Sequence, residues 1–213
     1  MMVDIPEKIV HSGLLQAWKQ LAALQPRDVC QRTGADFESS KGQYLLRCLG
    51  QEIRISPGAY LMHAESEIGD YLVRDMSELF QLPALWYLLQ AKNVPCSQRL
   101  IRPEELPGGD MFSSGSHVLP LHKISARFGT RPQYLLESAL RLQANQLDFA
   151  DAAIKLWPLP RMPITLVLWA EDEEFPANTS LLLDSTAGLH LPVDTLWSAA
   201  MCCILLLLRI TED

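Results

Sequence analysis

The chain has 213 residues, 48% of them hydrophobic, and a formal net charge of −7 at pH 7. A chain of this length and composition can bury the core of one domain without disulfides or structural metals, so we expect residues 1–213 to form a single domain. Asp and Glu outnumber Lys and Arg by 25 to 18. Because no cationic surplus is left to displace counterions from phosphates, we expect no nucleic-acid partner.

The apolar segments of the sequence predict a soluble, cytoplasmic protein. The opening residues, MMVDIPEK, do not combine a basic segment with a long apolar one, as a secretory signal would. The longest uncharged apolar run, residues 199–208, is about half as long as a membrane span, which predicts a buried helix and no membrane association. The five cysteines include no C-x-x-C pair and are expected to be free thiols.

The first third of the chain predicts a helix followed by a β-hairpin. Apolar residues near helical spacing, with Pro6 in a first-turn position, predict a helix over residues 6–24. The segment QYLLRCLGQEIRIS predicts a hairpin over residues 43–56, with Gly50 in its turn. Residues 59–75 fit no single pattern, although residues 71–73 are compatible with a short strand.

A largely helical middle, residues 76–145, is expected next. Its first helix has two candidate capping residues, Asp75 and Ser77, and an apolar face that fits helical spacing. Pro83 lies inside this pattern and either kinks the helix or starts a second segment.

The rest of the middle predicts a long loop and two further helices. Residues 94–117 are rich in Pro, Gly and Ser, and loops of this length in a compact domain are often functional or mobile. Helices are then expected over residues 119–128 and 130–145, the second with Pro132 just inside its start.

The C-terminal third, residues 151–211, predicts an antiparallel meander and a closing helix. The expected elements are strands at 152–157, 164–169 and 180–184, and a helix at 193–210 with Asp194 as its candidate cap. Together these elements predict an α+β fold, with a mixed or antiparallel sheet of about five strands and helices mainly on one face.

The most distinctive local feature is an acidic cluster, Glu171–Glu174, directly after the apolar run that ends at Trp169. Two carboxylates on one side of the chain, joined by Asp184 from a neighbouring strand, are suited to holding a hard divalent cation or to raising the pKa of one member for acid–base chemistry. A charged turn that ends a hydrophobic strand gives the same pattern. The sequence leaves both interpretations open.

Other motifs of enzymes are missing from the sequence. No H-E-x-x-H, Walker-type glycine loop, dinucleotide fingerprint or G-x-S-x-G is present, and Gly109 in PGGD fits a tight turn. No catalytic residue is therefore predicted, and the sequence identifies neither a metal nor a cofactor. It does not predict an oligomeric state either.

Five segments resemble a known prokaryotic family, domain of unknown function 3786, from about residue 40 to the C-terminus. They are YLLRCLGQEIRI, LWYLLQAKNVP, ELPGGDMF, RFGTRPQYLLESA and LPRMPITLVLWAEDEEFPANTSLLLDSTAGLHLPVD. The most specific part is the tryptophan–acidic–Phe-Pro stretch, residues 169–176, with its following Leu-x-Asp-Ser. Where family members commonly read Leu-Phe-Asp, this chain reads Leu-Leu-Asp at residues 182–184.

The resemblance implies the kind of organism and metabolism in which the protein acts, but no particular reaction. The family is found largely in anaerobic bacteria and archaea, and some members carry a cysteine-rich, cluster-binding segment reminiscent of corrinoid-dependent one-carbon metabolism. This chain lacks that segment. The family offers no catalytic residues to transfer to positions in this sequence.

These observations lead to one main functional hypothesis and two alternatives. The main one is an accessory protein of anaerobic metabolism that binds a small ligand or cofactor. Its pocket would be formed by Trp169 and the 107–117 loop, with polar contacts from the carboxylates of residues 172, 174 and 184 and with Arg161 as a candidate to neutralise one of them. The candidate site is Trp169, Asp172, Glu174, Asp184, Arg161 and Gly109. The first alternative is a protein–protein adaptor with an exposed apolar patch at Leu82, Leu85 and Trp86. The second is a divalent-metal-dependent enzyme that uses the carboxylates of residues 171–174 and 184.

Overall fold

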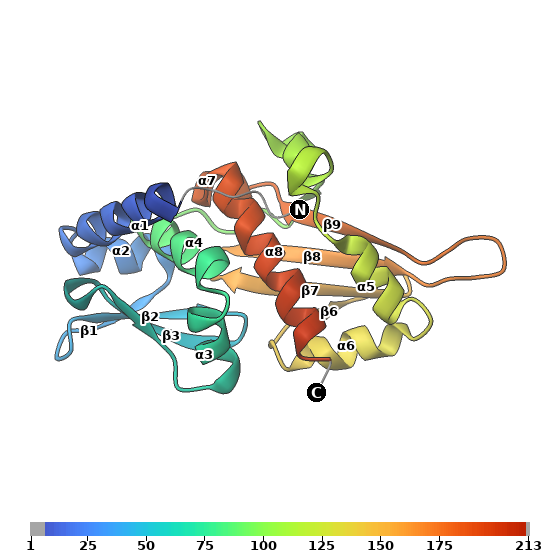
Figure 1. The fold of residues 1–213 in the computed structure, drawn as a ribbon, viewed down its shortest axis with the longest axis horizontal. Helices are drawn as coiled ribbons and strands as arrows, with labels where there is room; N and C mark the ends of the chain where they lie inside the picture. The colour runs from blue at the N-terminus through green and yellow to red at the C-terminus, as the bar shows by residue number, and fades with distance from the viewer. Residues whose placement is uncertain (1–6, 212–213) are drawn as a thin grey trace.

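The computed structural model describes residues 7–211, and it confirms the predicted α+β class (Figure 1). The strands form two antiparallel sheets, one of five strands as predicted and a second one of four strands. The helices are α1 (Glu7–Ala22), α2 (Pro26–Thr33), α3 (Glu67–Arg74), α4 (Ser77–Gln90), α5 (Leu121–Phe128), α6 (Pro132–Leu140), α7 (Ala187–His190) and α8 (Val193–Arg209). The strands are β1 (Asp36–Glu38), β2 (Gln43–Cys48), β3 (Gln51–Ser56), β4 (Leu61–His63), β5 (Leu100–Ile101), β6 (Asn145–Leu147), β7 (Ala152–Leu159), β8 (Met162–Trp169) and β9 (Asn178–Asp184).

Sheet A has the strand order β1-β2-β3-β4 and contains the predicted hairpin as β2 and β3. Its turn places Leu49 and Gly50 at φ values of 49° and 77°, the left-handed pair that suits the twist of a two-residue hairpin. The same turn joins the two sheets, because the backbone N–H of Leu49 donates to the carbonyl of Trp157 in β7 at 2.7 Å.

Sheet B has the order β5-β9-β8-β7-β6, and its strands β7, β8 and β9 form the predicted meander. In β8, every residue from Met162 to Leu168 is buried, since the strand is covered on both faces. Strand β6 was not predicted: the helix expected over 130–145 ends at Leu140 as α6, and residues 145–147 pair with β7.

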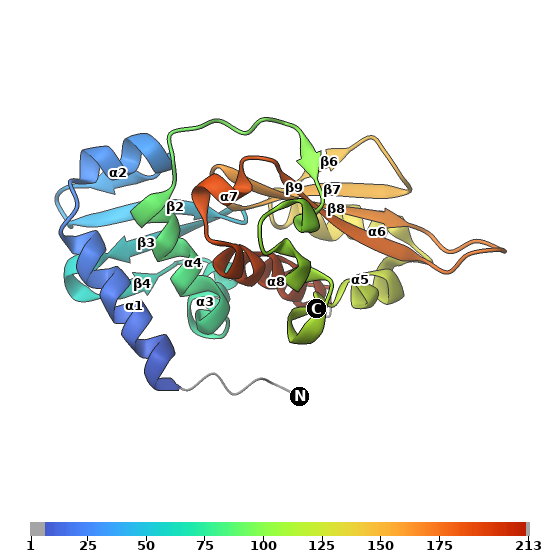
Figure 2. The same ribbon diagram turned by 90° about the horizontal axis from the view of Figure 1, so that it is seen from above.

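Most of the helices lie on one side of the strands, as predicted, with α2 on the opposite side (Figure 2). The apolar helix α8 packs against α4 and the sheet, and its Cys202 and Cys203 are buried. No helix in the described range is both long and apolar enough to span a membrane.

Helix starts differ from the predictions in three places. Helix α4 begins after Met76 with no side-chain cap, so neither Asp75 nor Ser77 has the predicted role, and it continues through Pro83. Helix α8 begins after Pro192 without a side-chain cap, although Asp194 was expected to supply one. Residues 71–73 belong to α3 and not to a strand, because Ser66 caps a helix there by accepting the Gly69 N–H at 3.1 Å.

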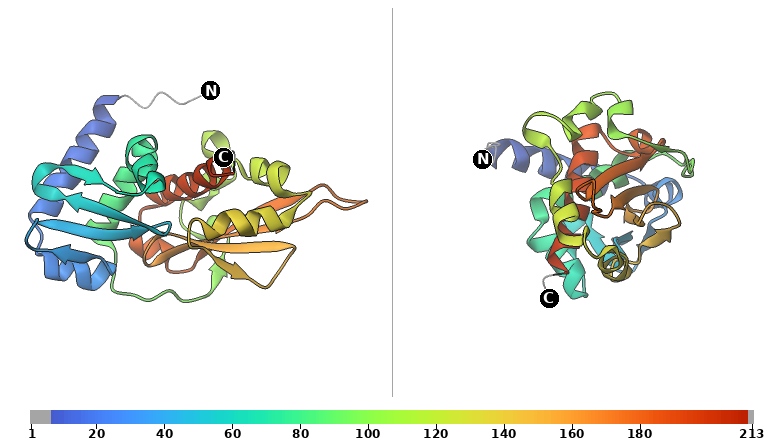
Figure 3. Two further views of the ribbon diagram at one scale, coloured as in Figure 1. Left: turned by 90° about the horizontal axis from the view of Figure 1, so that it is seen from below. Right: turned by 90° about the vertical axis from the view of Figure 1, so that its right-hand side faces the viewer.

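An extended segment, residues 91–99, connects the two parts of the fold and is called the strap below. It leaves α4 beside sheet A and crosses to β5 at the edge of sheet B (Figures 2 and 3). The predicted long loop thus contains a strand, β5, and three short 3-10 turns at Pro103–Glu105, Gly109–Phe112 and Gly115–His117.

Candidate functional site

The residues of the predicted site lie at opposite ends of sheet B. Trp169 ends β8 and faces Asn178 at the start of β9, whereas Asp184 ends β9 beside the start of β8. A strand of this length spans roughly 20 Å at about 3.3 Å per residue. The antiparallel turn therefore brings Trp169 close to Asp172 and Glu174, and places Asp184 at the other end, near Arg161.

The acidic cluster forms the tip of the β8–β9 hairpin, which projects from the body of the molecule (Figure 1). Oδ1 of Asp172 accepts the backbone N–H groups of Glu174 at 2.8 Å and Phe175 at 2.7 Å. The carbonyl of Phe175 accepts the N–H of Asp172 at 3.0 Å. All four acidic side chains are exposed. One carboxylate thus stabilises the turn, and the other three face solvent.

Asp184 is buried and fully used in hydrogen bonding. Its Oδ1 accepts the N–H and Oγ–H of Ser97 at 3.0 and 2.9 Å, and the N–H and Oγ1–H of Thr186 at 3.0 and 2.7 Å. Its Oδ2 accepts the N–H of Gln98 at 2.8 Å. Burial alone would raise the pKa of Asp184, but the hydrogen bonds from Thr186 and Ser97 outweigh it and lower the pKa to about 2. This carboxylate is an anchor for the strap.

Arg161 joins three segments at the same end of the sheet. Its N–H donates to the hydroxyl of Tyr87 at 3.0 Å, its Nη2 donates to the carbonyl of Gln31 at 3.3 Å, and its carbonyl accepts the thiol of Cys96 at 3.5 Å. Tyr87 in turn donates to the carbonyl of Thr33 at 2.8 Å. Arg161 therefore ties α2 and α4 to the strap.

His190 lies in this cluster, at the end of α7, and sequence analysis gave it no role. It is fully buried, its ring centroid is 6.2 Å from that of Tyr87, and neither ring nitrogen has a hydrogen-bond partner in the described part of the chain. Burial lowers the pKa of His190, and the positive charge of Arg161 lowers it further. The ring is therefore neutral at pH 7.

The arrangement of Cys96, His190 and Asp184 lacks the contacts of a nucleophilic site. The Cys96 thiol donates to a carbonyl, and His190 accepts nothing from it. Burial and the nearby Asp184 raise the pKa of Cys96, whereas a thiolate nucleophile needs a lowered pKa. Across residues 7–211, no group of three His, Cys, Asp or Glu side chains is placed to hold a metal ion.

Gly109 is buried in the turn Gly109–Phe112, against the chain at Pro103. A Cβ at this position would overlap the carbonyl group of Pro103. The structure thus gives a packing reason for glycine here, away from Trp169 and the hairpin.

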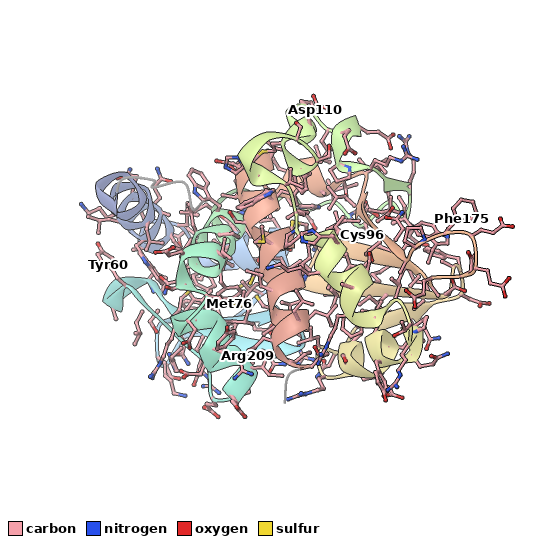
Figure 4. The ribbon with its side chains drawn as sticks, turned by 45° about the vertical axis from the view of Figure 1, so that its right-hand side comes forward. Tyr60, Met76, Cys96, Asp110, Phe175 and Arg209 are labelled. Atoms are coloured by element: carbon pink, nitrogen blue, oxygen red, sulfur yellow. The ribbon has the colours of Figure 1, made fainter. Side chains whose placement is uncertain are left out.

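A groove lies elsewhere, between the α3–α4 junction and α5, with α8 at its base; we call it the α4/α5 groove. Its volume is about 780 Å³. Two of its lining residues, Met76 and Arg209, are labelled in Figure 4. It is lined by Tyr71, Asp75, Met76, Ser77, Glu78, Leu79, Lys123, Ala126, Arg127, Leu205, Leu208 and Arg209.

Sequence analysis did not identify this groove. Its lining comes from four helices that are distant in the chain, and each contributes only a few residues. The one local signal is the pair Lys123 and Arg127, which four-residue spacing places on one face of α5. Such pairs usually belong to a solvated helix face.

Comparison with known proteins gives one match. The model of a family described as "Domain of unknown function (DUF3786)" matches residues 25–205. The match begins before the segments on which the resemblance rested and includes all the elements from α2 to most of α8. Neither the curated proteins nor the solved structures contain a match to this chain.

Proposed function

Since the chain belongs to the DUF3786 family, which carries no assigned activity, we propose a function from geometry: the protein binds a small molecule in the α4/α5 groove. The observation that carries this proposal is the groove itself. Its volume of about 780 Å³ lies within the range of small-molecule sites. Apolar side chains from α4 and α8, among them Leu79, Leu205 and Leu208, line it together with charged groups of both signs, which can orient a polar ligand.

This proposal keeps the ligand-binding hypothesis but places the binding site at other residues than those predicted from the sequence. The residues first assigned to a pocket are divided between an exposed hairpin and a buried anchor, and the buried ones already have partners within the chain. The anaerobic, corrinoid- or one-carbon-related setting remains part of the proposal and depends on the family resemblance alone.

The test is a fragment screen by two-dimensional NMR on the full chain. We expect fragments that bind to shift backbone amides of α5 and the end of α8. Ala126→Trp should abolish these shifts, because the indole would occupy the groove that Ala126 lines. Ala22→Trp, at an exposed helical alanine away from the groove, is the matched control and should keep them. Fragment shifts that survive Ala126→Trp would contradict the proposal.

A second candidate function, a protein–protein adaptor, is favoured by exposed aromatic side chains at the hairpin end of sheet B. Phe175, Trp169 and Phe149 are 67%, 44% and 41% exposed, and Phe175 projects outward in Figure 4. Carboxylates surround them, so the surface fits a partner with Lys or Arg around an apolar pocket. The patch first considered for an adaptor is a poorer candidate, because Leu85 is fully buried.

A photo-crosslinking amino acid at position 175 tests this second candidate in cells. An adaptor would give one discrete crosslinked product, weakened when Glu171, Glu173 and Glu174 are all changed to Gln. The control is the same amino acid at Leu140, which is 70% exposed and lies outside the hairpin. An identical product from position 140 would exclude a specific hairpin partner.

A further inference from the structure

We infer that the α4/α5 groove takes a zwitterion: a molecule with a cationic group, an apolar body, and a carboxylate or phosphate group. This inference rests on the proposed function and specifies its ligand class. The two walls of the groove carry opposite charges. Asp75 and Glu78, at the start of α4, form an acidic wall. Lys123 and Arg127, on α5, form a basic wall.

The charges of the two walls do not pair with each other. Within residues 7–211, neither carboxylate forms an ion pair, and neither does Lys123. The groove therefore has two carboxylates at its α4 side and two cationic side chains at its α5 side, and Asp75, Glu78 and Lys123 form no ion pair within the described residues.

Helix packing keeps the walls apart. Helices α4 and α5 each pack against α8, which supplies the base of the groove through Leu205 and Leu208. Met76 and Leu79 add apolar surface on the α4 side. Closing the gap between the walls would require one helix to leave its packed position on α8, and packed interiors resist such changes. A ligand that spans the gap can satisfy both walls without moving them.

The basic wall has donors left for an anion. Arg127 uses Nη2 to donate to the carbonyl of Thr211, and a guanidinium has further N–H groups. Lys123 supplies an ammonium group. A carboxylate or phosphate on this side, and an ammonium beside Asp75 and Glu78, would form charge-assisted hydrogen bonds.

ε-Aminocaproic acid, in which an alkyl chain separates the ammonium from the carboxylate, and three analogues test the inference in NMR titrations of the full chain. N-acetyl-ε-aminocaproic acid keeps only the anion, ε-aminocaproamide keeps only the cation, and aminopentylphosphonic acid replaces the carboxylate by a phosphonate. We expect ε-aminocaproic acid or its phosphonate analogue to shift groove amides, and the two singly charged compounds to bind at least about tenfold more weakly. The stronger of the two zwitterions identifies the anionic group.

Single-residue variants assign each charge to its wall. Glu78→Gln should weaken zwitterion binding about tenfold and leave the binding of N-acetyl-ε-aminocaproic acid unchanged, while Lys123→Gln should weaken the binding of both. Unfolding midpoints check that each variant folds. Equal binding of the zwitterion and the anion, or no effect of Glu78→Gln, would overturn the zwitterion inference and leave the groove as a binding site. If fragments bind the groove and neither zwitterion does, the zwitterion inference is likewise overturned and the groove remains a binding site. If no compound shifts groove amides in either screen, the proposed function fails as well.

Discussion

Asp184 holds Ser97 through two hydrogen bonds to one oxygen, Oδ1, at 3.0 Å from the backbone nitrogen and 2.9 Å from Oγ. The two residues are 87 positions apart. With the Gln98 N–H on Oδ2, a single buried carboxylate determines the path of the strap. Gln98 has a φ of 63°, a backbone conformation that side-chain-bearing residues rarely adopt, and these hydrogen bonds offset its cost.

Removing the Asp184 carboxylate should destabilise the fold. Asp184→Ala leaves the partly buried N–H groups of Ser97 and Gln98 without their acceptor, so we expect the free energy of unfolding to fall by about 3 kcal/mol. Urea denaturation followed by circular dichroism measures the loss. Asp172→Ala is the control, because that carboxylate accepts two backbone N–H groups in an exposed turn; it should cost about 1 kcal/mol or less. Equal losses would contradict the role of Asp184 as anchor.

Lowering the pH should reduce the stability that the Asp184 carboxylate contributes. The pKa of Asp184 is about 2 in the folded protein, against an ordinary value of 3.8. The unfolded chain therefore binds the proton first, so this contribution is complete above about pH 4 and is lost as pH falls toward 2. The difference between the two pKa values corresponds to roughly 2 kcal/mol in the free energy of unfolding. A comparison of the wild type with Asp184→Asn at pH 5 and pH 3 isolates this contribution. The difference in free energy of unfolding between the two proteins should be smaller at pH 3. An equal difference at both pH values would refute the lowered pKa of Asp184.

The buried imidazole of His190 should make stability fall as pH decreases from neutral. Its pKa is lowered in the folded state, so the unfolded chain takes up a proton first once the pH drops below the ordinary 6.5. His190→Leu removes both the titration and the unpartnered nitrogens. We expect the free energy of unfolding of this variant to rise relative to that of the wild type as the pH is lowered from 7 to 5. His190→Gln removes only the titration. A parallel pH dependence of wild type and His190→Leu would show that the ring is not held neutral.

Gly109 should tolerate no larger side chain. In Gly109→Ala the added Cβ would overlap the carbonyl of Pro103, and backbone atoms cannot rotate away as a side chain could. We expect a loss of about 2 kcal/mol or more in the free energy of unfolding. Gly58→Ala is the control, because a Cβ there meets no atom within 4 Å. Thermal denaturation of the two variants gives the comparison; a stable Gly109→Ala protein would show that the turn can shift.

Local sequence signals predicted the parts of the fold that depend on neighbours in the chain. The apolar run that forms β8 and the glycine turn after β2 each carry their own pattern. Strand β6 has only three residues and is stabilised by pairing with β7, so its sequence simply continued the helical spacing before it. The division of the strands into two sheets depends on distant contacts, such as that between Leu49 and Trp157, which no short pattern encodes.

The candidate site was less predictable for the same reason. Asp172 and Asp184 are close in sequence, but an antiparallel hairpin places a strand's length between them. Glu78 and Lys123 are far apart in sequence, yet both line the α4/α5 groove because α4 and α5 both pack on α8. The spacing of acidic residues along a chain identified a turn, whereas the groove arises from helix packing.

The strap also determines an order of events in folding. Sheet A and its hairpin are built from segments close in sequence, whose contacts form quickly, whereas the strap can be fixed only after the chain has been made through β9 and Asp184 has become buried. We expect the β5–β9 edge to be completed late during synthesis and refolding. Its amide hydrogens should also be the first in sheet B to exchange with solvent when the native protein opens locally.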